Sequence, residues 1–488
     1  MVLRGARCFS IIEMIAPLHA PDPAGQSGRM NGRSAGWRNA LTASLIMLAF
    51  AAAGWKILSR EPAANFAPLT QKAPRSTPSS DISVDEPKLS KAVQEASPDG
   101  SFRFDARFVS AAPGKAVHAA SLVELRDGRL QAVWFSGSRE GAGDVAIRSS
   151  VMDPSTLQWG PETVLVGREQ LQRALWRYVK KIGNPVIARA PDGSLRLWMV
   201  NVSLGGWAGS SISWSRSTDE GASWSQPRRL VTSPFLNIST LVKAGPVAMA
   251  NGDISLPVYH EFLTKFGEVL RLNADGQIVD KVRIANSQTS LQPVLLANGA
   301  ERAQVYLRSG NARALMTSDT LDAGKSWSPT RASAWPNPDS ALAGLVSRTG
   351  GQWLALNPAE RNRDVLALLQ APAGVSFDGA RRWTVESSVS PQILIAADSF
   401  DRLLSDELIA RGASAAQAQA YVASAMRQLC NSGSCAQEFS YPYLLQSRDG
   451  YIHLVYTWHR TRIKHVRFDP LQPPPASAAA LTHVSATH

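Results

Sequence analysis

The chain reads STDEGASW at residues 217–224 and TLDAGKSW at residues 320–327. Both stretches fit the pattern Ser/Thr-x-Asp-x-Gly-x-Ser-Trp, although they are far apart in the chain. A pattern that returns with this fidelity indicates a structural unit that the fold uses several times. The sequence therefore predicts a fold built from internal repeats.

Weaker versions of the pattern surround Asp153, Asp275 and Asp378. With the two full copies they give one turn every 47 to 66 residues, which suits four-stranded sheets joined by loops of variable length. Stretches such as SLVELRDGRLQAVWF and PYLLQSRDGYIHLVYTW read as strand, Asp-Gly turn and strand. These signals predict an all-β fold, a six-bladed β-propeller whose sixth sheet is closed by an early strand near FRFDARFVS. Five or seven blades are the alternatives.

One stretch departs from the β pattern. Residues 398–429 are rich in Ala, Leu, Gln and Arg and predict one or two helices within an insertion at about 398–437. Cys430 and Cys435 lie in CNSGSC, a loop that a disulfide could close in an oxidising compartment, and two free thiols are the alternative. The third cysteine, Cys8, is remote from them in sequence.

The N-terminal part contains an uncharged stretch from Asn39 to Trp55, preceded by arginines. Residues 39–58 therefore predict a transmembrane anchor or a cleaved signal segment. An anchor would hold the rest of the chain at a membrane, in the periplasm or extracellular space, and cleavage would give a secreted protein. The other expected parts are an N-terminal extension (1–38), a disordered linker (59–100), the folded region (101–470) and a flexible tail (471–488).

The net charge is +12, but the chain has no tight run of Lys and Arg and no nucleic-acid motif. We therefore expect no nucleic-acid partner, and a basic cleft for an acidic ligand is the better interpretation. No phosphate-binding loop, Ser-His-Asp pattern or metal-ligand spacing is present in the sequence. We expect no cofactor and no metal.

The region 101–470 resembles the sialidase-like superfamily of propellers built from BNR repeats. The two octapeptides match its Asp-box, and HAASLVELRDG, WFSGSREGAGDVAI, LRSG and FSYP add to the likeness. The resemblance implies Asp-box turns between outer strands and an exo-acting hydrolase for terminal acidic sugars of glycans. It also implies three arginines that bind the sugar carboxylate, a Tyr–Glu pair as nucleophile and an Asp as acid/base.

The chain departs from that family pattern at two positions. His118 stands where the family has its first arginine, and Phe439 stands at the position of the nucleophilic tyrosine. Tyr441, two residues on, is expected to face the same side of a regular strand as Phe439. Arg308 matches a family arginine that precedes an Asp-box. The sequence therefore predicts a member that diverges from true sialidases.

Inner strands of a propeller converge on one axial mouth, where residues distant in sequence can meet. Carboxylates and cations gathered there would suit acid/base chemistry on a glycosidic bond. A lyase acting on uronic-acid glycans and a non-catalytic glycan-binding propeller are the alternatives. The candidates for catalysis are Glu140, Asp144, Glu261 and Tyr441, and those for substrate binding are His118, Arg139, Lys181, Asn184, His260, Arg308, Asp339, Arg361 (or Arg363) and Arg460.

Overall fold

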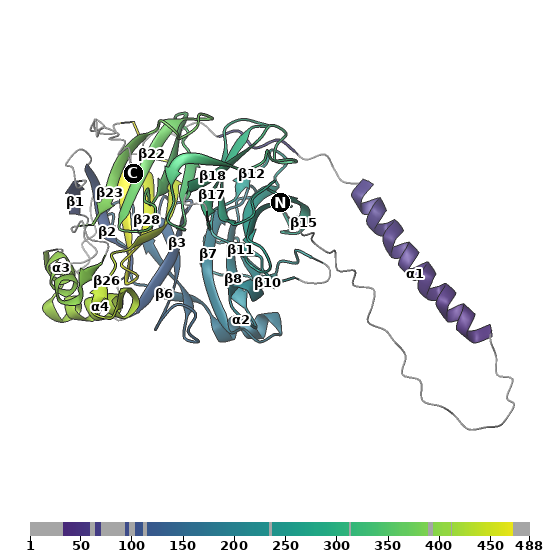
Figure 1. Cartoon of the computed structure of the whole chain (residues 1–488), viewed down its shortest axis with the longest axis horizontal. Helices are drawn as coiled ribbons and strands as arrows, with labels where there is room; N and C mark the ends of the chain where they lie inside the picture. The colour runs from purple at the N-terminus through teal and green to yellow at the C-terminus, as the bar shows by residue number, and fades with distance from the viewer. Residues whose placement is uncertain are drawn as a thin grey trace, which may run out of the picture. The chain divides into compact units, whose positions relative to one another are not determined.

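The computed structural model describes residues 33–58, 64–69, 93–96, 103–110, 115–233, 237–311, 314–388, 394–410 and 412–471. The chain divides into two units, Met1–Pro62 and Ala63–His488. The first contains helix α1 (Arg33–Leu58), which includes the predicted anchor or signal segment 39–58 (Figure 1). Among the helices of the described residues, none is long and apolar enough to cross a membrane. The prediction of a transmembrane anchor is therefore not supported.

The second unit consists mainly of antiparallel sheets with four or five strands each. The first sheet contains β3 (Ala116–Glu124), β4 (Leu130–Gly137), β5 (Ala146–Met152) and β6 (Thr163–Gly167). The second contains β7 (Lys181–Arg189), β8 (Leu195–Val202), β9 (Ser210–Ser217) and β10 (Arg228–Arg229). The third contains β11 (Leu241–Val242), β12 (Val247–Ala248), β13 (Ile254–His260), β14 (Phe266–Leu272) and β15 (Ile278–Arg283). The fourth sheet contains β16 (Ser290–Ala297), β17 (Ala303–Ser309), β18 (Ala314–Thr320) and β19 (Arg331–Pro336). The fifth contains β20 (Ala343–Val346), β21 (Gly351–Leu356), β22 (Val365–Pro372) and β23 (Arg381–Ser387). The sixth contains β27 (Phe439–Gln446), β28 (Ile452–Trp458), β29 (Arg462–Phe468), β2 (Arg103–Phe108) and β1 (Val93–Ala96).

The predicted hairpins are confirmed, and glycine explains their turns. β3 joins β4, and β27 joins β28, through Asp-Gly turns in which Gly128 and Gly450 have φ of +88° and +96°. A residue with a Cβ is strained in this left-handed region, whereas glycine is not. The alternation of apolar strands and Asp-Gly turns in the sequence therefore translates directly into paired strands.

The repeated octapeptides form the turns between the last two strands of a sheet. The Asp219 carboxylate accepts hydrogen bonds from the Ser217 hydroxyl (2.8 Å) and from the N–H and hydroxyl of Ser223 (2.9 and 2.5 Å). Asp322 makes the equivalent contacts in the second copy. The weaker copies around Asp153, Asp275 and Asp378 occupy the same place in three other sheets. The repeat is thus a structural element of the sheets.

The first strands of the six large sheets follow one another in a ring. β3 lies against β7, β7 against β11, β13 against β16, β16 against β20, β20 against β27, and β27 against β3. The sixth sheet combines both ends of the unit, because β2 pairs with β29 as the sequence predicted. Side chains at the ends of these inner strands can therefore meet although they are distant in sequence.

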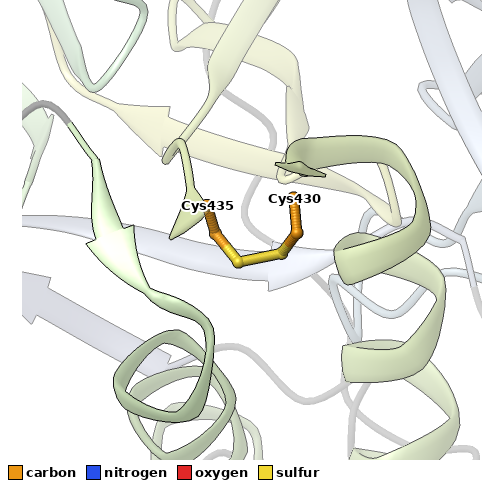
Figure 2. Close-up of a disulfide and its surroundings, with 2 residues drawn as sticks. All are labelled: Cys430 and Cys435. Carbon is orange, nitrogen blue, oxygen red and sulfur yellow. A yellow bond between two sulfur atoms is a disulfide. The ribbon is translucent and has the colours of Figure 1, made fainter. Parts of the chain in front are cut away.

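The predicted helical insertion is also confirmed. It comprises α3 (Ala397–Ala410) and α4 (Ala415–Leu429), followed by β25 (Cys430–Asn431) and β26 (Ser434–Cys435). β26 pairs with both β25 and β24 (Ile395–Ala396). Ser414 and Gln417 form a capping box at the start of α4. Cys430 and Cys435 are joined by a disulfide at the end of α4 (Figure 2). In Figure 1, α3 and α4 lie along the same edge of the unit as α2 (Arg168–Leu175), which connects β6 to β7.

Part of the predicted disordered linker (59–100) is ordered, which corrects that prediction. Residues 64–69 lie along the β domain, where the N–H groups of Phe66 and Ala67 bind the carbonyls of Ala300 and Ala248 (2.7 and 2.9 Å). The Phe66 side chain is buried in a core cluster, and β1 extends the sixth sheet. Composition could not reveal this, because an open sheet edge binds any backbone N–H. Most of the predicted extension (1–38) and tail (471–488) lies outside the described residues.

Replacing Phe66 tests whether this segment contributes to stability. We expect Phe66→Ala to lower the free energy of unfolding by about 3–5 kcal/mol, the usual cost of removing a buried phenylalanine ring. Leu69→Ala, in the same segment but half exposed, should cost well under that. Urea denaturation of both variants makes the comparison, and equal losses would contradict the packing role of Phe66.

Candidate functional site

The inner strands are irregular at one equivalent level. β3, β7, β16 and β27 each show a register shift close to their N-terminal ends. At these shifts Ala119, Asn184, Gln292 and Tyr441 have left-handed backbones, with φ of +55°, +42°, +48° and +53°. Left-handed conformations of residues with a Cβ cost free energy and are concentrated at functional sites. A bulge also redirects the side chain next to it, and here four bulges surround one place.

The bulge in β27 corrects the prediction made for Tyr441. In a regular strand Tyr441 would face the same side as Phe439, but the register shifts between Ser440 and Tyr443. Phe439 is buried in the core beside α3 and α4. The Tyr441 ring instead lies against His118 of β3, with 4.1 Å between ring centroids. The bulge therefore separates two aromatic residues that alternation alone would have placed together.

The Tyr441 hydroxyl is held by two donors. Arg308 Nη1 lies 3.4 Å from this oxygen and Gln292 Nε2 lies 3.3 Å from it. Gln292 also accepts a hydrogen bond from Arg308 (3.1 Å), which fixes the orientation of its amide. Arg308 Nε donates to the Asp339 carboxylate at 2.6 Å. Burial lowers the pKa of Arg308, but Tyr441 and Asp339 outweigh it and raise this pKa above its usual value.

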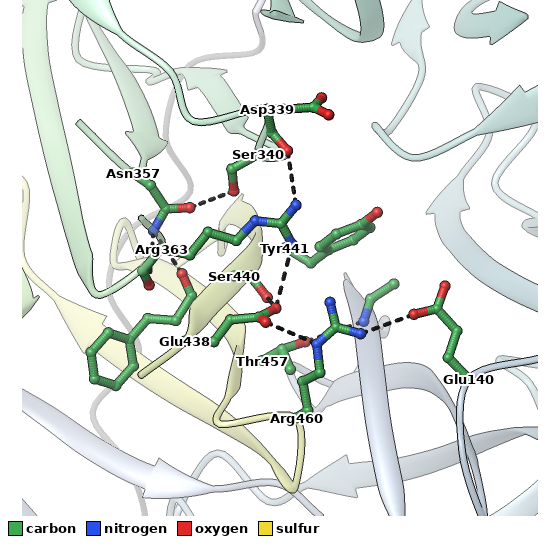
Figure 3. Close-up of polar contacts among 12 residues, drawn as sticks. Glu140, Asp339, Ser340, Asn357, Arg363, Glu438, Ser440, Tyr441, Thr457 and Arg460 are labelled. Carbon is green, nitrogen blue, oxygen red and sulfur yellow. Dashed lines mark hydrogen bonds and ion pairs between the residues drawn. The ribbon is translucent and has the colours of Figure 1, made fainter. Parts of the chain in front are cut away.

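A second pair of arginines is organised by one buried carboxylate. Glu438 accepts a hydrogen bond from Arg460 Nε (2.9 Å) and lies 3.4 Å from Arg363 Nη1, as Figure 3 shows. The Ser440 hydroxyl donates to the same carboxylate at 2.5 Å. Burial alone would raise the pKa of Glu438, but Arg460 and Arg363 hold it at about 2. Glu438 is therefore ionised and fixes the two guanidinium groups.

Two further carboxylates interact with the arginines of this cluster, Glu140 with Arg460 and Glu261 with Arg308. Glu140 accepts a hydrogen bond from Arg460 Nη1 (3.0 Å), and its side chain is 36% exposed. Glu261 lies at the end of β13, where its backbone N–H donates to the Ser239 hydroxyl. Burial raises the pKa of Glu261, and Asp339 and Glu140 add to the effect, against Arg308 and Lys265. A carboxyl that keeps its proton more readily than usual can donate it to a leaving group.

His118 is buried, and its Nδ1 has no hydrogen-bond partner within the described part of the chain. Burial, followed by the charge of Arg460, lowers the pKa of His118 well below its usual value. The imidazole is therefore neutral. It presents a flat, uncharged ring to Tyr441 at the point where the family pattern has an arginine.

The other predicted residues have separate contacts. Asn184 donates to the Tyr259 hydroxyl (3.3 Å), which also accepts from Gln292. Lys181 lies over the Trp207 ring. His260 binds Glu268 (2.8 Å) and stacks on Phe266. Asp144 accepts hydrogen bonds from Ser138 in the β4–β5 loop, and Arg139 and Arg361 are exposed in loops. Catalytic and binding roles for all of these residues stay predictions.

The sequence analysis missed Glu438 and Gln292 as members of the cluster. Glu438 directly precedes FSYP, and its position next to that stretch was the available signal. Gln292 gave no signal, because an amide in a short strand is ordinary. A group of three or more His, Cys, Asp and Glu side chains able to hold a metal does not occur among the described residues.

Residues 128–454 match the model of the BNR repeat-like domain. The fold is similar to that of a Hadza microbial sialidase, with 12% identity and a TM-score of 0.54 over 73% of this chain and 66% of that one. It is also similar to the intramolecular trans-sialidase from Ruminococcus gnavus solved with oseltamivir carboxylate, with 11% identity and a TM-score of 0.53 over 75% of this chain and 96% of that one. A Dyadobacter fermentans protein of unknown function is similar as well, with 11% identity and a TM-score of 0.56 over 74% of this chain and 97% of that one. At these identities the likeness shows the fold alone. No curated protein matches the chain in sequence.

Glu438→Gln tests the arrangement of the arginines. Loss of the buried charge leaves two cations without compensation, so we expect the free energy of unfolding to fall by about 3–5 kcal/mol at neutral pH. Because the folded-state pKa is about 2, below the ordinary 4.5, the wild-type contribution is complete above pH 4.5 and is lost as the pH falls towards 2.

The matched control is Glu301→Gln, which alters an exposed glutamate. We expect urea denaturation to give a lower free energy of unfolding for Glu438→Gln than for wild type at pH 7, and a smaller difference between the two at pH 3. The role of Glu438 would be refuted if Glu438→Gln had the same free energy of unfolding as wild type at pH 7. It would also be refuted if Glu301→Gln lowered the free energy of unfolding by the same amount as Glu438→Gln.

Proposed function

The chain belongs to the BNR repeat-like domain family, and from this membership and the geometry of the cluster we propose that it is an exo-acting glycoside hydrolase for terminal acidic sugars. The six large sheets are then the six blades of a propeller, and the bulged ends of their inner strands form the substrate mouth. The Cys430–Cys435 disulfide supports action outside the cytoplasm, where such bonds persist.

The observation that carries this proposal is the convergence of Arg308, Arg460 and Tyr441. Guanidinium groups bind a carboxylate through paired N–H donors. Both arginines carry a partly exposed carboxylate partner, Asp339 (43% exposed) and Glu140 (36% exposed). A substrate carboxylate can replace such partners, whereas buried Glu438 stays in place. The site is therefore suited to exchange one carboxylate for another.

Tyr441 is the proposed nucleophile. The hydrogen bonds from Arg308 and Gln292 stabilise negative charge on its oxygen as the phenolic proton passes to solvent. The oxygen attacks the anomeric carbon, and the bond to the leaving sugar breaks. Glu261, whose pKa is raised by burial, gives its proton to the departing oxygen. Glu261 then takes a proton from a water molecule, whose oxygen attacks the anomeric carbon. The bond to Tyr441 breaks, the acidic sugar is released, and the Tyr441 oxygen regains a proton from solvent.

One observation favours the second candidate, a lyase for uronic-acid glycans. The buried neutral ring of His118 lies against Tyr441, and a neutral imidazole beside a phenol can abstract a proton next to a carboxylate neutralised by arginine. This chemistry leaves a double bond in the product, whereas hydrolysis does not.

Incubation of the purified chain with sialosides and with uronic-acid glycans tests the proposal. We expect release of an acidic monosaccharide from one of these substrates. Arg308→Lys should lower kcat/KM by about 10²–10³-fold, because lysine cannot reproduce the paired donors, and Tyr441→Phe should abolish turnover. Arg331→Lys, on exposed β19, is the matched control and should retain full activity.

The products decide between the classes. If ultraviolet absorbance increases, as expected for a product with a new double bond, and no acidic monosaccharide is released, the protein is a lyase and the hydrolase proposal is wrong. Binding that Arg308→Lys weakens, without any product, would leave a glycan-binding propeller. Full activity in Tyr441→Phe would remove this residue from the mechanism.

A further inference from the structure

A cavity lies on the inner strands, towards the ends opposite the candidate site. Its volume is about 580 Å³, and its aliphatic wall includes Leu122 of β3, Leu296 of β16, Val346 of β20 and Leu444 of β27. This volume falls within the range of small-molecule sites, which are mostly apolar with a few polar groups. Leu69 at its edge is 49% exposed, so the cavity opens to solvent.

The cavity and the candidate site occupy opposite ends of the same strands. In β3, His118 belongs to the site and Leu122 to the cavity, and in β27 Tyr441 and Leu444 are divided in the same way. Four residues of a strand span roughly 13 Å. The aliphatic wall of the cavity is therefore distinct from the candidate site, with Lys243 between the two, and nothing in the proposed hydrolysis uses it.

The charges around the cavity are unequal. Five basic residues line it, namely Arg126, Arg189, Lys243, Arg348 and Arg448, against one acidic residue, Glu124. Arg448 pairs with Glu124 (3.1 Å), and Arg126 and Arg189 share Glu220. In the described part of the chain, Lys243 and Arg348 donate only to the backbone carbonyls of Pro442 and Ser447. Two positive charges therefore lack a carboxylate partner.

Lys243 is the more unusual of the two, because its side chain is almost completely buried. Its ammonium group lies 5.6 Å from the Tyr441 ring centroid and 5.7 Å from that of Tyr443. Burial lowers the pKa of Lys243 to about 7. A buried ammonium without an anion is costly, and an anion that reached it through the cavity would remove that cost.

We propose that this cavity binds an amphipathic carboxylate, with its aliphatic chain against the leucine and valine wall and its carboxylate at the Lys243 ammonium. The wall excludes a sugar as the preferred occupant, since sugar hydroxyls would find few partners among leucine and valine side chains. The charge excludes a neutral lipid, which would leave Lys243 uncompensated. An aliphatic acid satisfies both conditions.

Isothermal titration calorimetry of the full-length protein with octanoate tests the proposal by measuring the dissociation constant. 1-Octanol probes the aliphatic chain without the charge, and glucuronate probes the carboxylate without the aliphatic chain. We expect octanoate to bind, and 1-octanol and glucuronate to bind at least 10-fold more weakly. Lys243→Met keeps the length of the side chain and removes the charge, and should weaken octanoate about 10–100-fold, as expected for a charged hydrogen bond. Lys325→Met, at an exposed lysine, is the matched control.

Lys243→Gln, which also removes the charge, provides a second variant should Lys243→Met fail to fold, and it should weaken octanoate binding in the same way. Octanoate affinity that is unchanged in either folded variant would overturn the proposal. So would the absence of octanoate binding, or equal affinity for 1-octanol or glucuronate.

Discussion

The candidate site depends on one backbone feature, the bulge that recurs near the start of four inner strands. Ala119, Asn184, Gln292 and Tyr441 each adopt a left-handed backbone at this level. Such a conformation costs about 1–2 kcal/mol for a residue with a Cβ, and the long strand ladders on either side offset it. A regular strand would direct every second side chain towards the neighbouring sheets. The bulges instead redirect the side chains at this level, which is how Gln292 reaches Tyr441.

The same positions explain how closely packed cations remain stable. Arg308 and Arg460 each lie between a fixed partner and a replaceable one. For Arg460 the fixed partner is buried Glu438 and the replaceable one is Glu140. For Arg308 the fixed partner is the Gln292 amide and the replaceable one is Asp339. Guanidinium groups arranged in this way are oriented before any ligand arrives, so little ordering is required on binding.

The fold was largely predictable, because its signals are local. Asp-Gly turns, Asp-boxes and the composition of residues 398–429 each specify a short piece of backbone, and the pieces agree with one another. The site was predictable only in part. Arg308, Arg460 and Glu140 belong to stretches that resemble the family sequence. The direction of the Tyr441 side chain instead depends on a bulge that the residue types in the strand do not predict. Glu438 joins the cluster through its contact with Arg363, in the β21–β22 loop of a neighbouring sheet, which a single sequence does not specify. The ordered segment around Phe66 escaped notice for a similar reason, since its partner is an open sheet edge.

The helical insertion has a structural connection to the site that its position in the sequence conceals. Arg460 lies in the β28–β29 turn, where His459 and Arg460 both have left-handed backbones, so this turn needs support. The next residue, Thr461, donates its hydroxyl hydrogen to the Tyr421 carbonyl of α4 (3.2 Å). Arg462 then packs its guanidinium over the Tyr421 ring, 4.3 Å from the centroid, and α4 itself is anchored by the apolar core that it shares with α3. A helix pair that supports this strained turn fixes the place of Arg460, and the insertion is therefore part of the framework of the site.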